Sequence, residues 1–294
     1  MEALKNKIDF VALVTVEMAN GNGDPLCGNR PRTDYNGFGE ISDVCIKRKI
    51  RNRLQDMGES VFVQSEDRCQ DGHDSLKSRA EACIGKAKTN KKSDGMDRKE
   101  YIKKACMTFI DVRTFGQVFA FKDSKKEDDE DETGVSIGVR GPVTIHQAVS
   151  ATPVEILSMQ ITKSVNGKPS ETLSSDRMGM KHIVRFGLYK IKGSINVQLA
   201  EATGFSHEDA DLLKECLRTL FENDASSARP EGSMNVHKLY WWEHNCKSGQ
   251  YPTYQVHDSV EIRLKDDSST PTSVNDYEIT VKELPGLSCK IYQG

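Results

Sequence analysis

A row of basic side chains follows a turn rich in glycine and asparagine. Lys47 and Arg51 stand one helical turn apart, and Arg48 lies beside them. Such a row matches a line of phosphates and would release counterions when a polyanion binds. A solvated helix face has the same composition, because basic helices are common on protein surfaces. The preceding turn and Arg32 favour the first interpretation, since positive groups and free amides then meet at one end of a sheet.

The turn itself has the spacing Gly21-x-Gly23-x4-Gly28. Glycine and asparagine tolerate positive φ, so the segment is a tight turn with exposed backbone amides. The spacing is neither that of a dinucleotide fingerprint nor that of a P-loop, which also needs a Lys-Ser/Thr pair. A mononucleotide site is therefore not predicted, whereas a nest of amides for a single phosphate stays open.

The sequence contains no convincing catalytic constellation. The serine-hydrolase pattern G-x-S-x-G and the zinc pattern H-E-x-x-H are both absent. His182 could serve as a general base beside Lys181 or Arg185, or it could be a polar side chain at a strand edge, because acid–base catalysis also needs a positioned partner.

The cysteines do not indicate a metal centre. Cys69, His73 and Cys83 could meet at a metal, but no fourth ligand follows at zinc spacing. The eight cysteines include no C-x-x-C pair, which is typical of scattered reduced thiols. We expect neither a metal nor a cofactor.

The bulk composition limits the class of protein. The chain has 294 residues, 29% of them charged and 36% apolar, and a formal net charge of -3. This acidity excludes a polyanion binder that is basic over its whole surface, but not one with a local basic patch. No stretch approaches the ~20 apolar residues that cross a bilayer, so we expect a cytoplasmic protein without a membrane partner.

Hydrophobic periodicity predicts a mixed sequence of strands and helices. Ile8 to Met18 has apolar residues on both faces and indicates a strand in a covered sheet. Ser42 can cap a helix whose buried stripe is Ile46, Ile50 and Leu54, and Ser206 can cap a second. Further strands are predicted at 135–145, interrupted by Arg140-Gly141-Pro142, and at 183–199, 237–243, 260–264 and 277–281.

The order strand, helix, strand, strand, helix, strand is that of the ferredoxin-like, split βαβ arrangement. We therefore predict an α+β fold and a single elaborated domain over residues 1–294, since no linker separates apolar halves. Insertions are expected at about 60–108 and about 155–182. The charge run within about 122–134 is expected to be a solvated, mobile loop.

Several motifs resemble, in order, the repeated backbone subunit (Cas-seven, Csd-type) of the type I-C CRISPR Cascade complex, in the RAMP superfamily. They are Asn20-x-Asn22-Gly23-Asp24-Pro25, Pro31-Arg32, Asp43 to Arg51, Asp111 to Gly116, Val139 to Val143, Gly179 to Val184 with Gly187-Leu188-Tyr189, and Ser226 to Arg229.

This resemblance implies a fold and a set of partners. The fold would be a βαββαβ palm like an RNA-recognition motif, with fingers at about 60–108, a web, and a thumb at about 155–182. Copies would stack head to tail along a guide RNA (crRNA) and present it to target DNA. The crRNA-processing capping subunit and the large PAM-reading subunit of Cascade would be further partners.

A guide of arbitrary sequence has to be held through phosphates and sugars, because base contacts would restrict its sequence. The palm lacks the paired aromatic residues of an ordinary RNA-recognition sheet. The RNA-binding residues then expected are Asn20, Asn22, Arg32, Ser42, Lys47, Arg48, Arg51, Arg113, Arg140, Lys181 and His182. Three methionines of the expected thumb, Met159, Met178 and Met180, could unstack bases as apolar wedges or could fill a core.

Three hypotheses stay open at this stage. The first is the non-catalytic guide-RNA scaffold. The second is an RNA-processing endoribonuclease of the same superfamily, using His182 with Lys181 or Arg185. The third is a protein-assembly module whose basic helix is incidental.

Overall fold

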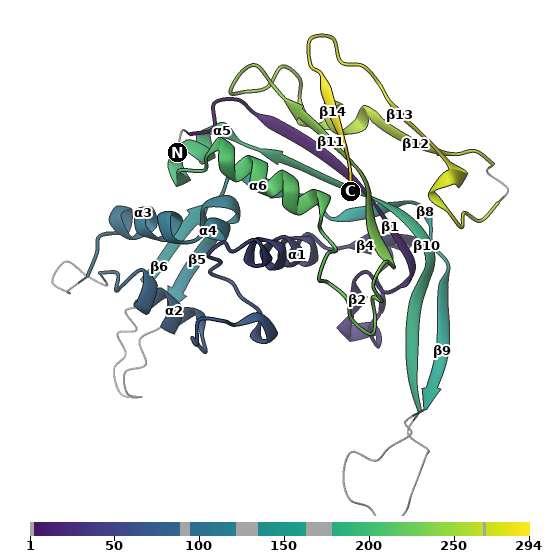
Figure 1. Ribbon diagram of the computed structural model, residues 1–294, viewed down its shortest axis with the longest axis horizontal. Helices are drawn as coiled ribbons and strands as arrows, with labels where there is room; N and C mark the ends of the chain where they lie inside the picture. The colour runs from purple at the N-terminus through teal and green to yellow at the C-terminus, as the bar shows by residue number, and fades with distance from the viewer. Residues whose placement is uncertain (1–2, 89–94, 122–134, 163–177, 267–268) are drawn as a thin grey trace, which may run out of the picture.

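The computed structural model describes residues 3–88, 95–121, 135–162, 178–266 and 269–294 (Figure 1). Its main feature is an antiparallel sheet in the order β14-β11-β1-β10-β8-β4, with β7 and β9 also pairing with β10. These strands are β1 Ile8–Ala19, β4 Phe38–Ile41, β7 Val143–Ile145, β8 Ala148–Pro153, β9 Ile156–Thr162, β10 Met178–Ile195, β11 Met234–Glu243 and β14 Cys289–Gln293.

The remaining elements are helices and short two-stranded ladders. The ladders are β2 Gly23–Asp24 with β3 Arg30–Pro31, β5 Gly116–Phe121 with β6 Val135–Arg140, and β12 Val260–Leu264 with β13 Tyr277–Val281. The helices are α1 Asp43–Asp56, α2 Leu76–Cys83, α3 Arg98–Thr108, α4 Ile110–Phe115, α5 Val197–Thr203, α6 His207–Arg218 and α7 Thr253–Asp258, with 3-10 turns at Pro25–Cys27, Glu66–Arg68 and Val274–Asp276.

The predicted α+β class and split βαβ arrangement are confirmed. The first half of the fold runs from β1 through α1 to β7 and β8, and the second runs from β10 through α5 and α6 to β11. In the sheet, β10 separates β1 from β7 and β8, while β1 separates β10 from β11. Each half is thus split by a strand of the other, as the ferredoxin-like arrangement requires.

Strand β1 is buried on both faces, as its composition predicts. Phe10, Ala12 and Val14 belong to a core shared with α1, α5 and α6, whereas Val11 and Leu13 belong to a second core. That second core is closed by α7 and the β12–β13 ladder. Neither face of the central strand is therefore open to a ligand.

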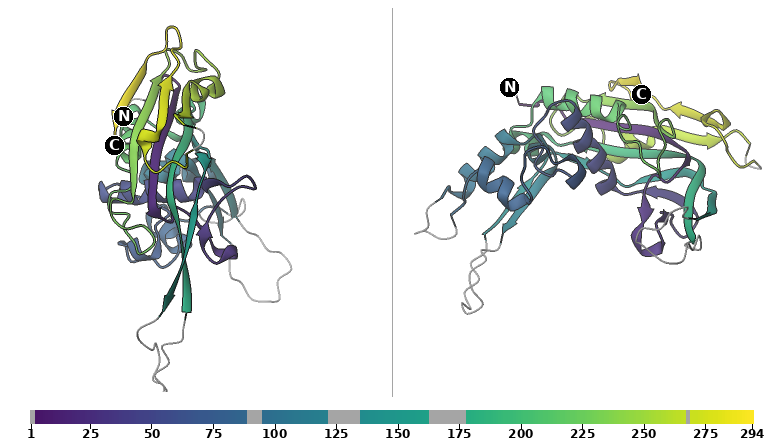
Figure 2. Two further views of the ribbon diagram at one scale, coloured as in Figure 1. Left: turned by 90° about the vertical axis from the view of Figure 1, so that its right-hand side faces the viewer. Right: turned by 60° about the horizontal axis from the view of Figure 1, so that its bottom comes forward.

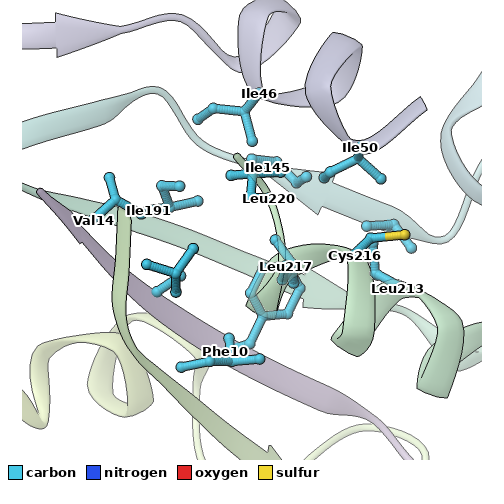
Figure 3. Close-up of a cluster of buried hydrophobic side chains, with 14 of the residues drawn as sticks. Phe10, Val14, Ile46, Ile50, Ile145, Ile191, Leu213, Cys216, Leu217 and Leu220 are labelled. Carbon is cyan, nitrogen blue, oxygen red and sulfur yellow. The ribbon is translucent and has the colours of Figure 1, made fainter. Parts of the chain in front are cut away.

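The two long helices on the first face begin at predicted caps. The Ser42 hydroxyl accepts a hydrogen bond from the Cys45 amide at the start of α1. Ser206 and Asp209 form a reciprocal capping box at the start of α6. Ile46, Ile50, Leu213, Cys216 and Leu217 are among the side chains that meet Phe10 and Val14 of β1 in the buried cluster of Figure 3. Each fully buried Leu or Ile there contributes about 1.5–3 kcal/mol.

A separate hydrophobic core lies beside α1 (Figure 1). It is built from α2, α3, α4 and the β5–β6 ladder, with Phe62 at its centre between Phe109 and Phe119. The ring centroids of Phe62 lie 5.2 and 5.1 Å from those of Phe109 and Phe119, within the usual range for aromatic pairs. This third core packs α2 and α3, which lie in the expected fingers segment, against α4 and the β5–β6 ladder.

One prediction about the strands is wrong. The strand expected over 183–199 ends at Ile195, and α5 begins at Val197. The Asn196 side chain caps this helix by accepting the Leu199 amide, and Val197, Ala200 and Thr203 are buried at helical spacing. The apolar alternation of three residues was too short to distinguish the two periods. No strand was predicted at the positions of β4, β5, β8, β9 and β14.

The expected interruption at Arg140-Gly141-Pro142 is confirmed, because it separates β6 from β7. The predicted strands at 237–243, 260–264 and 277–281 correspond to β11, β12 and β13. The expected loop at 122–134 lies outside the described residues. Among the helices that the structure does describe, none is both long and apolar enough to span a bilayer.

Candidate nucleic-acid interface

The asparagine- and glycine-rich turn is tied to its surroundings by its own side chains. The Asn20 side chain is buried and donates from Nδ2 to the Asn29 carbonyl at 2.7 Å. Asn22 accepts the Ser42 amide on Oδ1 at 2.9 Å, so it joins the turn to the start of α1. Asn22 and Ser42 are thus joined, and Asn20 shapes the same turn, while a role of the three residues in binding RNA stays a prediction.

Arg32 lies at the same end of the sheet and is only loosely paired. Its Nη2 lies 3.4 Å from Asp24 Oδ1, and 37% of the side chain is exposed. Its Nε is buried without a hydrogen-bond partner in the described part of the protein. Because a guanidinium has five N–H donors, Arg32 keeps donors available for an anion.

The three predicted cations of α1 each have a partner within the protein. Lys47 pairs with Asp43 at 3.0 Å one turn earlier in the helix. Arg48 donates to the Val63 carbonyl at 2.7 Å, and burial, followed by the nearby Arg51, lowers its pKa. Their role in binding RNA stays a prediction, but they do not form the row of free cations that the sequence suggests.

Arg51 is the most firmly held of the three. Its Nε donates to Asp111 Oδ2 at 2.9 Å, and its guanidinium carbon lies 5.1 Å from the centroid of the Phe115 ring. Asp111 is 1% exposed and also accepts the amides of Phe62 and Val63, at 2.7 and 3.1 Å. Arg51 and Asp111 therefore join α1 to α4 and to the backbone at Phe62 and Val63.

The predicted arginines Arg113 and Arg140 differ in whether they have a partner within the protein. Arg113 makes two parallel hydrogen bonds to Asp209, at 3.0 and 2.7 Å, and so joins α4 to α6. Arg140 is exposed at the end of β6, where the described residues offer it neither a hydrogen bond nor an ion pair. Of these two side chains, Arg140 is the one available to a ligand.

Lys181 and His182 lie on opposite faces of the β9–β10 hairpin, which projects from the sheet (Figures 1 and 2). His182 pairs across the hairpin with Ser158, and Lys181 pairs with Met159. Successive side chains of a strand alternate between its faces. His182 Nδ1 lies 2.9 Å from Ser158 Oγ, which in turn accepts a hydrogen bond from Arg30 Nη1 at 3.3 Å.

The three methionines are exposed, so they do not fill a core. Met159, Met178 and Met180 are 40%, 68% and 55% exposed. Met178 and Met180 share the face of His182, whereas Met159 lies on the face of Lys181. At most two of them can therefore act as a wedge on one face of the hairpin.

The family model described as CRISPR-associated protein Cas7 matches residues 6–282. This chain belongs to the Cas7 family. The family predicted from the ordered motifs is thereby confirmed, while the I-C subtype stays a prediction.

A protein of the same description from Haloferax volcanii is 28% identical over 295 residues, which cover 95% of this chain and 82% of the relative. Two solved chains have 16% identity to this Cas7-family chain and TM-scores of 0.45 and 0.41. They come from structures described as "CRISPR RNA-guided surveillance complex, pre-nicking" and "CRISPR RNA-guided surveillance complex". Both alignments cover 80% of this chain, with 78% and 68% of the respective solved chains.

The Cas7-family chain has further basic residues at this end that sequence reasoning did not select. Lys49 is buried in α1 and pairs with Asp224, which also accepts from Arg229 Nε at 3.1 Å. Burial lowers the pKa of Lys49, and Asp224 opposes that shift. Arg229 ends the motif Ser226 to Arg229, and this motif was the sequence signal that could have identified it. Arg30 stands between the glycine-rich turn and the Pro31-Arg32 motif, and that position was its available signal.

No metal centre emerges from the described residues. They contain no group of three or more His, Cys, Asp or Glu side chains that could hold a metal ion. Cys69 instead donates to the His73 carbonyl at 3.1 Å and accepts from Arg79 Nη2 at 3.3 Å. The cysteines with described environments are free thiols.

Proposed function

We propose that this Cas7-family chain is a non-catalytic backbone subunit that holds guide RNA in a type I-C CRISPR surveillance complex in the cytoplasm. Copies would assemble head to tail along the guide and present it to target DNA. The observation that carries the proposal is the surface between the turn and the β9–β10 hairpin, where Arg30 and Arg32 supply positive charge and His182 lies beside Ser158, the partner of Arg30.

The covered sheet supports binding through the RNA backbone. Side chains of the β1 face that an ordinary RNA-recognition sheet would expose, such as Val11 and Leu13, are completely buried under α7 and the β12–β13 ladder. Bases therefore have no platform there on which to stack. A guide of any sequence would be held by arginine, lysine and histidine contacts to phosphates at the end of the sheet.

The hairpin supports an assembly of identical copies. Its exposed apolar side chains include Met178 and Met180 on one face and Met159 and Ile161 on the other. Exposed apolar surface of this kind favours contact with a partner. We propose that the hairpin of one copy reaches the guide on the next copy, and that the ends of the assembly contact the capping subunit and the PAM-reading subunit.

The surroundings of His182 favour binding over cleavage. Lys181 lies on the opposite face of the hairpin, and Arg185 pairs with Glu155 at 3.0 Å. Neither proposed catalytic partner is therefore placed beside the imidazole, and general acid–base catalysis needs such a partner within hydrogen-bonding reach.

Sizing the purified chain with and without RNA tests the scaffold. RNA should produce long assemblies whose size grows with RNA length, because a head-to-tail contact builds an open filament. A repeat-bearing transcript incubated in parallel without metal should stay intact. Cleavage that His182→Ala abolishes would support the endoribonuclease, and assemblies of the same size without RNA would support a protein-assembly module.

A further inference from the structure

Three polar side chains from distant segments meet where the hairpin leaves the sheet. Arg30 comes from β3, Ser158 from β9 and His182 from β10. Arg30 Nη1 lies 3.3 Å from Ser158 Oγ, across 128 residues of sequence. Ser158 Oγ lies 2.9 Å from His182 Nδ1. The hydroxyl thus lies between a guanidinium and an imidazole.

The local backbone fixes this arrangement on both sides. Gly28 and Asn29 adopt left-handed φ values of 63° and 59°, which bring the chain back from β2 into β3 at Arg30. The Asn20 side chain holds the Asn29 carbonyl at 2.7 Å. On the other side, Ser158 and His182 are direct partners in the β9–β10 register, so their side chains share a face.

The outward groups of the cluster are hydrogen-bond donors. Ser158 Oγ already accepts from Arg30, so its own proton is available to His182 Nδ1. When Ser158 donates to Nδ1, the neutral imidazole carries its proton on Nε2. The described residues provide no partner for that N–H, and the exposed Arg30 uses only one of its five donors.

The neighbouring carboxylates are already neutralised. Asp24 faces Arg30 across the β2–β3 ladder, but its Oδ1 accepts the Leu26 amide at 3.1 Å and lies 3.4 Å from Arg32. Glu155, at the start of the hairpin, pairs with Arg185. Two arginines thus share the single charge of Asp24, so the cluster keeps net positive charge, and none of the described carboxylates accepts a hydrogen bond from Arg30 or His182.

We propose that Arg30, Ser158 and His182 form a binding site for one phosphate of the RNA backbone, and that this phosphate links the turn to the hairpin. The inference rests on the proposed function and names a site within it. A non-bridging oxygen would accept from Arg30, and a second would accept from His182 Nε2–H. Such charge-assisted hydrogen bonds are short and strong. The site reads no base, so it suits a guide of arbitrary sequence.

Binding of a labelled single-stranded RNA to the full chain, over a series of salt concentrations, tests the site. Arg30→Ala and His182→Gln should each weaken binding roughly tenfold, since each removes a hydrogen bond to a charged group. Arg30→Ala should also reduce the slope of log K against log salt by about 0.7, the value for one phosphate on a single strand. Arg30→Lys should keep the slope and lose part of the affinity, because lysine keeps the charge without the fork.

The matched control is Arg263→Ala, which removes an exposed arginine (74% exposed) from β12. It should leave affinity and slope unchanged. The Arg30→Ala/His182→Gln double variant should bind better than the product of the two single losses predicts, because both groups hold the same phosphate. Single variants that match the control, or losses that simply multiply, would overturn the site. Wild-type protein without salt-dependent RNA binding would instead overturn the proposed function.

Discussion

Arg51→Ala should destabilise the protein much more than it weakens RNA binding. The substitution leaves the Asp111 carboxylate, which is 1% exposed, without its cation. Removing one partner of a buried pair costs about 3–5 kcal/mol. Asp111 keeps the amides of Phe62 and Val63, so we expect a loss near the lower limit, about 3 kcal/mol.

Urea unfolding followed by circular dichroism measures this loss. The double variant Arg51→Ala/Asp111→Asn should recover part of the stability, because the uncompensated charge is gone. Asp211→Ala is the matched control, since it breaks a surface pair with Lys214 and should cost less than about 1 kcal/mol. The reasoning would be refuted if Arg51→Ala kept nearly the wild-type free energy of unfolding while its RNA binding lost the salt slope of one phosphate contact. Arg51 would then be an RNA-binding residue.

Three other perturbations follow from the structure. Arg113→Ala should lower the free energy of unfolding by about 3 kcal/mol in urea, because Asp209 loses both arginine hydrogen bonds in a buried setting. Gly116→Ala should lower the thermal midpoint more than Gly58→Ala: both have positive φ, but only at Gly116 would Cβ meet backbone atoms, at 2.3 Å. Burial lowers the pKa of Lys190 to about 8, so between about pH 8 and 10 the unfolded chain binds more protons than the folded chain. As the pH rises through this range, the free energy of unfolding of the wild type, measured by urea titration, should therefore increase relative to that of Lys190→Met.

The local features of the fold were predictable because their signals are local. The capping serines Ser42 and Ser206 predict the starts of the two main helices. Apolar residues on both faces of β1 predict that this strand is covered on both sides. The boundary at Asn196 was missed because three alternating apolar residues also fit a helix that buries Val197 and Ala200.

The site was less predictable because its contacts connect distant parts of the chain. Nothing near Arg51 in the sequence indicates that Asp111, 60 residues away, neutralises it. The meeting of Arg30 with Ser158 spans 128 residues and belongs to no motif. The basic composition of α1 fitted both a phosphate-binding row and a solvated helix face, and only the tertiary structure shows which of its charges have partners.

The proposed function is that this Cas7-family chain holds RNA through the phosphates of the RNA and does not cut it. The most direct test measures the affinity of the full chain for two labelled single-stranded RNAs of unrelated sequence over a range of salt concentrations, with the RNA recovered afterwards. We predict equal affinities, a steep decrease with salt, and intact RNA. A strong preference for one sequence, an affinity independent of salt, or shortened RNA would contradict the account.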